Sequence, residues 1–208
     1  MQSFTIQQLA GTTDIYLLDQ IIKERYKPSD HVLDAGCGNG RNLHWFLVNH
    51  INCYGIDMDS MAIDQLKLKY PFLPGDRLQT GVVENLPFAD CFFDHIISSA
   101  VLHFANGHSQ FNAMLTEMVR VLKPGGTLFI RMTSNIGIEN AAQLILDGVY
   151  TIPDGTTRFL LTKPLLSKIL QDHSLHLIEQ LKTVNVCDIR CMTTLIMQRD
   201  SKDLLSLR

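Results

Sequence analysis

Short apolar runs alternate with amphipathic segments along the first two thirds of the chain. Apolar runs of strand length occupy residues 31–35, 52–56, 78–82, 93–98 and 126–132. Between them, apolar positions recur at helical spacing over residues 40–49, 60–69 and 107–122. A further helix is predicted over residues 13–26, capped by Thr12 or Thr13 and stopped by Pro28. Strands that alternate with helices predict a parallel, doubly wound α/β sheet with right-handed crossovers.

The pattern changes after Met132. Residues 133–163 contain Gly137, Gly148, Pro153 and Gly155 and one short apolar segment, 141–146. A helix follows over 164–173, and then two β-like runs, 175–186 and 192–199. Their five-residue connection predicts an antiparallel hairpin. We therefore expect a mostly parallel seven-stranded sheet with helices on both faces and a C-terminal antiparallel hairpin.

The most informative polar positions lie where the first two strands end. Asp34 ends the first strand, glycines follow at positions 36, 38 and 40, and Asp57 ends the second strand. This pattern indicates a tight loop that brings the backbone close to a ligand, and a second carboxylate that faces the same ligand. A carboxylate in that place suits the vicinal hydroxyls of a ribose, because it accepts two hydrogen bonds. We therefore expect an adenosine-type cofactor.

The glycine spacing separates this loop from two common nucleotide-binding loops. The G-x-G-x-x-G pattern of dinucleotide folds needs a glycine where Arg41 stands, and a phosphate loop needs Lys-Ser or Lys-Thr after its glycines. The D-x-G-x-G-x-G pattern resembles instead motif I of the class I S-adenosylmethionine-dependent methyltransferases. Residues 81–90 with 93–99 resemble the third and fourth motifs of this family, and residues 119–128 resemble its helix-to-fifth-strand turn. The resemblance covers residues 28–133 in order.

The resemblance implies S-adenosylmethionine as the cofactor and S-adenosylhomocysteine as the product. Asp34 would hold the methionyl ammonium directly or through water, Asp57 would take the ribose hydroxyls, and Met58 would lie against the adenine. Ser99 would border the methionine end, and Arg41 is a candidate partner for the methionyl carboxylate. The expected cofactor-binding residues are Asp34, Gly36, Cys37, Gly38, Gly40, Arg41, Asp57, Met58, Val83, Glu84 and Ser99.

One position departs from the family pattern. Many members carry an aspartate in the third motif that accepts a hydrogen bond from the adenine amino group, and Val82 stands there in this chain. Adenine recognition is then expected to use the Val83 backbone, Glu84 or a group that the sequence does not identify.

The acceptor is expected to be a small molecule. The formal charge of −3 provides no excess of positive charge for binding nucleic acid. The fourth strand is not followed by the Asn/Asp-Pro-Pro-aromatic motif of the methyltransferases that modify amino groups of nucleic acids. His103 is a candidate base or acceptor-orienting residue, although a structural role fits it as well. Tyr150 and Arg158 are candidate acceptor-binding residues, since arginine pairs bidentately with carboxylates.

Composition excludes several other classes. The five cysteines are scattered without a second close pair, so no metal site is expected, and their odd number fits a reducing compartment. Residues 1–10 lack the features of a signal peptide, and no run is long enough to span a membrane. We expect a cytoplasmic protein, monomeric or homodimeric, with neither nucleic acid nor membrane as partner.

These expectations give one domain over residues 1–208. It comprises a helical cap (1–27), a cofactor-binding core (28–133), a substrate lid (134–163), a final helix with antiparallel strands (164–199) and a frayed tail. Three alternatives stay open. Residues 38–42 and 190–196 are similar to the tellurite-resistance methyltransferases, which would make the acceptor a chalcogen oxyanion or thiol. A non-catalytic protein that binds S-adenosylmethionine is the second alternative, and a dehydrogenase, disfavoured by Arg41 and the hairpin, is the third.

Overall fold

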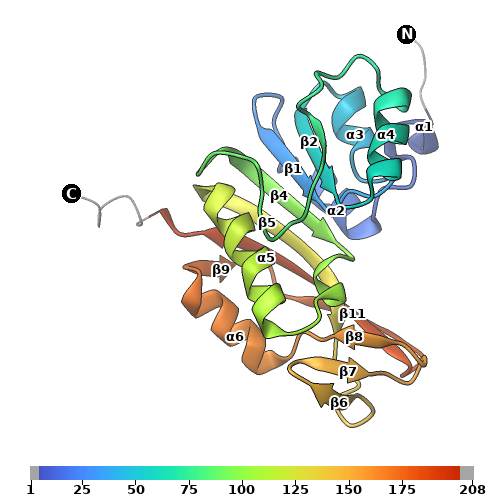
Figure 1. Cartoon of the computed structure of the whole chain (residues 1–208), viewed down its shortest axis with the longest axis vertical. Coiled ribbons are helices and arrows are strands. Elements are labelled where there is room, and N and C mark those ends of the chain that lie inside the picture. Colours follow the sequence, from blue (N-terminus) through green and yellow to red (C-terminus); the bar gives the residue numbers. More distant parts are fainter. Residues whose placement is uncertain (1–4, 202–208) are drawn as a thin grey trace.

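A computed structural model describes residues 5–201 and contains a central twisted sheet flanked by helices (Figure 1). The strand order is β10-β11-β5-β4-β1-β2-β3, and the first five strands in sequence run parallel. Their bounds are β1 (His31–Ala35), β2 (Asn52–Asp57), β3 (Leu78–Thr80), β4 (Phe93–Ser99) and β5 (Leu122–Ser134). The order turns back between β1 and β4, which is the switch point where open α/β sheets bind ligands.

The other edge of the sheet is antiparallel. The long strand β11 (Arg190–Arg199) pairs with β5 and carries two short strands on its outer side, β9 (Leu175–Leu177) and β10 (Lys182–Val186). The expected doubly wound sheet with a terminal hairpin is therefore confirmed, with its seventh position occupied by two strands instead of one.

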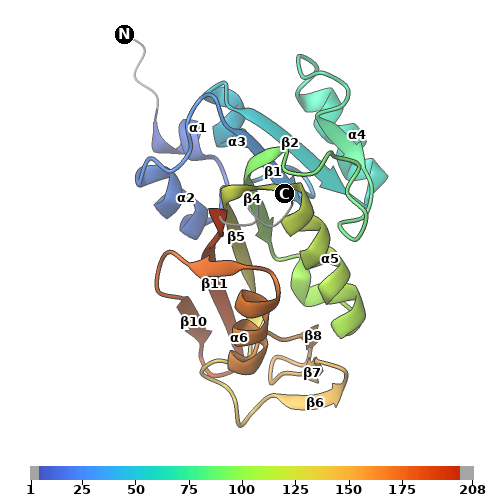
Figure 2. The same ribbon diagram turned by 90° about the vertical axis from the view of Figure 1, so that its left-hand side faces the viewer.

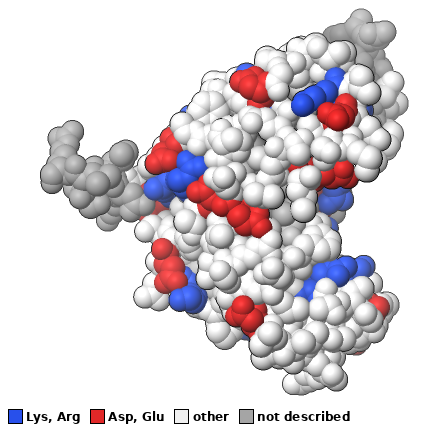
Figure 3. Space-filling view, in the orientation of Figure 1, with Lys and Arg blue, Asp and Glu red and all other residues white. Residues whose placement is uncertain are grey.

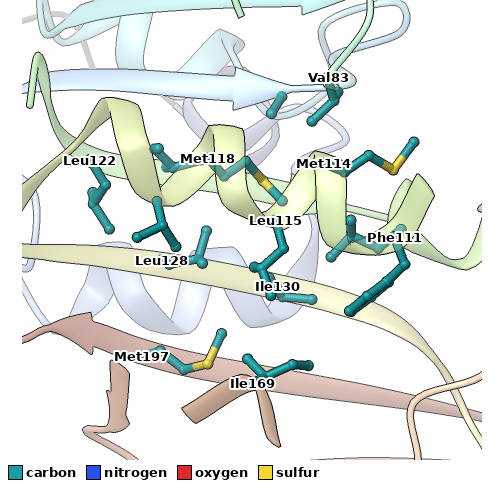
Figure 4. Packing of buried hydrophobic residues seen from close by; sticks show 14 of the residues in the cluster. Val83, Phe111, Met114, Leu115, Met118, Leu122, Leu128, Ile130, Ile169 and Met197 are labelled. Carbon is teal, nitrogen blue, oxygen red and sulfur yellow. The ribbon is translucent and has the colours of Figure 1, made fainter. Parts of the chain in front are cut away.

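Helices cover both faces of the sheet (Figure 2). Side chains of α2 (Ile15–Ile22), α3 (His44–Val48) and α4 (Ser60–Lys69) pack with Val32, Ile97 and Phe129 in one core, and α1 (Ile6–Ala10) lies beside α3. On the other face, α5 (His108–Val121) and α6 (Lys163–Asp172) pack over β4, β5 and β11. Figure 4 shows Leu115 and Met118 of α5 directed toward β5. Each fully buried side chain of this size contributes about 1.5–3 kcal/mol.

A second small sheet lies at the end of the molecule away from α1 and α3 (Figure 1). It is formed by β6 (Gln143–Leu146), β7 (Val149–Thr151) and β8 (Thr157–Phe159), all antiparallel. The chain then returns to β5, where the Leu161 N–H donates to the Thr133 carbonyl over 3.0 Å. The Phe159 ring stacks on Phe111 of α5 with ring centroids 4.7 Å apart. The insert is thus attached to the main sheet, and we call it the insert sheet.

Several predicted boundaries were wrong. The helix expected from residue 40 begins only at His44, because Gly40 adopts φ +73° and residues 39–43 form turns. Helix α2 is capped by Asp14, not by a threonine, and ends at Ile22 because Glu24 adopts φ +55°. The run over 175–186 is interrupted between β9 and β10. The expected frayed tail lies almost wholly outside the described residues.

Candidate functional site

A cavity of about 510 Å³ opens at the carboxyl ends of β1, β2 and β4. Parallel strands end at the same edge of the sheet, so the loops that follow them face one another across this cavity. The lining residues come from the loop after β1, the end of β2, the segment after β3, the segment after β4, and α5. They are Gly36, Gly38, Asp57, Met58, Gly81, Val82, Val83, Glu84, Ala100, Val101, Phe104, Gln110 and Met114.

The three glycines of the loop after β1 have different structural roles. Gly36 adopts φ +82°, and a Cβ there would lie 2.4 Å from a methyl of Val101. Gly40 adopts φ +73°, and a Cβ there would lie 2.6 Å from a methyl of Leu66. Gly38 also has a positive φ, but no atom lies within 4 Å of the place its Cβ would occupy. Gly36 and Gly40 therefore allow close packing, while Gly38 leaves space at the cavity wall.

The backbone N–H groups of Gly36, Cys37, Gly38 and Gly40 are used within the protein. Gly36 and Cys37 both donate to the Ile56 carbonyl, over 2.8 and 3.0 Å, and the Gly38 N–H donates to the Asp57 carboxylate over 2.7 Å. A pyrophosphate site needs free N–H groups at a helix N-terminus. No helix N-terminus follows this loop at the cavity, because α3 starts at His44, which is not among the residues that line the cavity.

The two predicted carboxylates lie in different environments. Asp57 lines the cavity and accepts from the N–H groups of Gly38 and Asp59, so its orientation is fixed while lone pairs remain available. Asp34 is only 1% exposed, and neither of its carboxylate oxygens has a hydrogen-bond partner in the protein. Burial raises the pKa of Asp34 to about 7, although the nearby Arg41 charge opposes this shift and Asp57 adds slightly to it. Asp34 is therefore a buried carboxyl beneath the glycine loop that lacks a polar partner.

The opposite wall is mainly apolar. Met58 is 77% exposed and Val82 is 43% exposed, both at the cavity. Val83 is buried behind them, and the Glu84 carboxylate accepts a hydrogen bond from the Gln110 side chain. The Glu84–Gln110 pair supplies polar atoms on this wall, close to the position where Val82 replaces the usual aspartate.

Five of the predicted cofactor residues do not line this cavity: Asp34, Cys37, Gly40, Arg41 and Ser99. The Cys37 thiol is buried in the core, and burial raises its pKa well above the usual range. Arg41 donates to the Ser99 hydroxyl over 3.0 Å and lies 3.5 Å from Asp14, and it faces a separate surface pocket. Ser99 in turn donates to Asp14 over 3.3 Å. These side chains connect α2 to the sheet behind the glycine loop.

A second cavity of about 300 Å³ adjoins the first, because Ala100 lines both. Its walls come from β5, β10, β11, the insert sheet and the 3-10 turn η1 (Leu102–Phe104). Its lining residues are Ala100, His103, Arg131, Thr133, Arg158, Val184, Val186, Arg190 and Met192. We call it the arginine pocket, since three guanidinium groups face it.

His103 lies in the arginine pocket as a neutral imidazole. Its Nδ1 accepts the backbone N–H of Thr133 over 3.3 Å, so the ring proton is carried by Nε2. Burial, together with the smaller effects of the Arg158, Arg190 and Arg131 charges, lowers the pKa of His103 to about 4. A ring with its free lone pair occupied is suited to donate a hydrogen bond through Nε2 and not to accept a proton.

Each arginine of the pocket is held by the protein. Arg131 donates to Asp14 over 3.0 Å, Arg190 lies 3.5 Å from Asp154, and Arg158 lies over the Phe104 ring at 5.0 Å. Arg158 was predicted, whereas Arg131 and Arg190 were missed as site residues. The signal for Arg131 was a charged residue inside an otherwise apolar strand. The predicted Tyr150 pairs with Arg158 across β7 and β8 but packs against a small apolar cluster and does not line either cavity.

Metal-binding clusters and membrane-spanning helices are both absent from residues 5–201. Within residues 5–201, no three His, Cys, Asp or Glu side chains come together as a metal-binding group would require. In the same part of the chain, none of the helices has the length and apolar character needed to cross a membrane. On the face shown in Figure 3, basic and acidic side chains are interspersed.

Comparison with known proteins places this cavity in a family context. The profile described as "Methyltransferase domain" matches residues 33–130, which contain the glycine loop, Asp57 and the Val82–Glu84 wall. A protein of Encephalitozoon cuniculi named as a methyltransferase is 38% identical over 106 residues, which is 50% of this chain and 46% of that protein. A tRNA (carboxymethyluridine(34)-5-O)-methyltransferase of Arabidopsis thaliana is 35% identical over 99 residues, covering 48% of this chain and 23% of that protein. The chain therefore spans less than half the length of these curated relatives.

Solved structures share the fold over nearly the whole chain. The 1,6-didemethyltoxoflavin-N1-methyltransferase of Burkholderia thailandensis, solved with S-adenosylhomocysteine, superposes with a TM-score of 0.66. The similarity covers 92% of this chain and 79% of that one at 17% identity. At this identity the comparison concerns the fold alone.

Proposed function

Because the chain belongs to the class I S-adenosylmethionine-dependent methyltransferases, we propose that it transfers a methyl group from S-adenosylmethionine to a small-molecule acceptor. The observation that carries the proposal is the 510 Å³ cavity bounded by Gly38, Asp57 and Met58. Its volume lies within the range of about 300–1,000 Å³ typical of ligand pockets.

The residues present fit this cofactor. Asp57 has lone pairs left for a ribose diol, and the exposed Met58 and Val82 give an apolar wall suited to adenine. Glu84, paired with Gln110, supplies a carboxylate that can accept from an adenine amino group in the place of the usual aspartate. Asp34, which has no polar partner in the protein, suits the methionyl ammonium, directly or through water.

In this assignment the cofactor supplies an electrophilic methyl group on a cationic sulfur. The protein then contributes position and exclusion of water. Gly36 and Val101 bring the chain close at the cavity wall, and Ala100 forms the boundary between the cofactor cavity and the arginine pocket. The acceptor atom must approach at this boundary, which supports the arginine pocket as the acceptor site.

Of the roles considered for His103 from the sequence, base, acceptor-orienting residue or structural residue, we propose that it orients the acceptor. Its Nδ1 is occupied and its Nε2–H is a donor, so a proton acceptor is not available on this ring. The proposed acceptors are therefore nucleophilic without a histidine base. Because one relative is named for a tRNA reaction, the small-molecule acceptor is itself part of the proposal, and RNA belongs among the substrates to be assayed.

The assay is formation of S-adenosylhomocysteine from S-adenosylmethionine in the presence of candidate acceptors, with calorimetry for cofactor affinity. Replacing Asp57 with Ala removes the ribose acceptor and the partner of the Gly38 N–H. We expect cofactor affinity to fall about 10- to 100-fold, the scale of a charge-assisted hydrogen-bond set. Asp64→Ala, an exposed carboxylate on α4, is the matched control and should leave affinity unchanged. Equal affinities for the Asp57 variant and the wild type would reject the ribose assignment.

A further inference from the structure

The arginine pocket concentrates positive charge in a chain whose formal net charge is −3. Arg131 comes from β5, Arg158 from β8 and Arg190 from β11, so three separate elements each contribute one guanidinium. Arg131 shares the Asp14 carboxylate with Arg41, Arg190 pairs with Asp154, and among the described residues Arg158 forms no ion pair with a carboxylate. The net charge of these side chains together is positive.

The arginines converge on one point. All three line the same cavity as His103, and their charges contribute to the lowered pKa of this ring. Like charges held close together repel, and an anion placed among them would relieve this repulsion. A guanidinium is also the side chain best matched to a planar oxyanion, since it offers paired N–H donors.

Each guanidinium is held in position before a ligand arrives. Asp14, which is buried, fixes Arg131, and Arg131 also lies over the Tyr16 ring at 5.1 Å. Phe104 supports Arg158 from the cofactor side, because it lines the first cavity. Holding the donors in place reduces the ordering cost of binding.

The side chains described next are apolar or donate a hydrogen bond. Val184, Val186 and Met192 form one wall, and His103 contributes the Nε2–H. This combination suits a ligand that has an oxyanion at one end and an apolar part beside it.

We propose that the arginine pocket binds an oxyanion group, a carboxylate or a phosphate, of the methyl acceptor. This inference rests on the proposed function in one respect: it assigns the anionic group to the methyl acceptor. The pocket adjoins the cofactor cavity at Ala100, so an acceptor anchored by its anionic group would present its nucleophilic atom at the boundary. The three arginines lie outside the matched methyltransferase segment, residues 33–130, and would therefore set acceptor specificity separately from cofactor binding.

The test uses the full chain with S-adenosylhomocysteine added, and titrates it with benzoate, phenyl phosphate, inorganic phosphate and the neutral analogue benzamide. We expect saturable binding of at least one of the three anions and none of benzamide. Benzoate binding would identify a carboxylate acceptor, and binding of either phosphate would identify a phosphate-bearing one. If no anion binds, or if benzamide binds as well as benzoate, the proposal is overturned.

Two variants link the binding to the pocket. Arg158→Gln and Arg190→Gln should each weaken anion binding at least tenfold, because each removes a charge-assisted hydrogen-bond donor. Arg77→Gln is the matched control: this arginine lies over Tyr54, far along the sequence from the pocket residues, and lines neither cavity. An equal loss in the control would contradict a specific site.

The same samples separate this proposal from the proposed function. S-adenosylhomocysteine affinity is measured first in every variant, and we expect it to stay within about twofold of wild type. Anion binding without nucleoside binding would reject the methyltransferase assignment and retain the pocket. Nucleoside binding without anion binding would retain the methyltransferase assignment and reject the arginine pocket as an anion-binding site.

Discussion

Asp34 is the residue whose environment differs most from that of an ordinary carboxylate. In the unfolded chain it ionises near its usual value of 3.8, whereas burial raises its folded pKa to about 7. Between these values the unfolded state loses its proton and the folded state keeps it, so the free energy of unfolding falls as pH rises from about 4 to 7. The full difference is roughly 4 kcal/mol, at about 1.4 kcal/mol for each unit.

Asp34→Asn should therefore stabilise the free protein at pH 8 by up to roughly 4 kcal/mol, with little effect at pH 4, while it weakens binding of a cationic methionyl group. Urea unfolding of both proteins across this pH range measures the first effect, and calorimetry measures the second. A stability change of the same size at both pH values would show that Asp34 is ionised in the folded protein.

At the residue scale, local sequence identified the cofactor side of the site and not the acceptor side. The glycines and Asp57 lie within one strand–loop–strand segment, so their spacing alone placed them together. Arg131 and Arg190 are brought together by the pairing of β5 with β11, which joins residues about 60 positions apart in the chain. Such pairing depends on tertiary contacts, which a local sequence pattern does not predict.

At the element scale, Asp14 joins α2 to the central sheet. Its carboxylate accepts from the Tyr16 N–H as a helix cap, and also from Arg131 and Ser99. Asp14→Ala removes the cap, worth about 0.5–2 kcal/mol, and leaves the half-buried Arg131 without its carboxylate. We expect the free energy of unfolding to fall by roughly 3 kcal/mol, measured by urea denaturation.

Asp19→Ala on the same helix is the control for this prediction. Asp19 pairs with Lys23 and Lys182 near the surface, where such pairs contribute less than about 1 kcal/mol. If the two variants lose the same stability, Asp14 does not have the connecting role assigned to it.

Element boundaries were predictable where a local stop signal exists. Helix α4 was predicted over residues 60–69 and found there, because Asp59 caps its start and Pro71 follows its end. The insert sheet was not predicted, since its strands are three or four residues long and Leu144 to Leu146 are exposed apolar residues without a two-residue alternation. Its attachment to β5 and α5 again depends on long-range contacts.

At the scale of the whole molecule, the two adjoining cavities have separate proposed roles, one in binding the cofactor and one in binding the acceptor. The parallel half of the sheet, with its family-matched segment 33–130, supplies the cofactor cavity. The antiparallel edge, the insert sheet and η1 supply most of the arginine pocket. The proposed cofactor site and the proposed acceptor site are therefore formed by different parts of the fold.

The first cavity is proposed to bind a sulfur nucleoside and not a dinucleotide. Calorimetric titration of the purified protein with S-adenosylmethionine, S-adenosylhomocysteine and NADH in parallel tests it most directly. We predict saturable binding of the first two with one site per chain, and no binding of NADH, because the N–H groups of Gly36, Cys37, Gly38 and Gly40 are bonded within the protein. Binding of NADH, or the absence of binding by both sulfur nucleosides, would contradict the account.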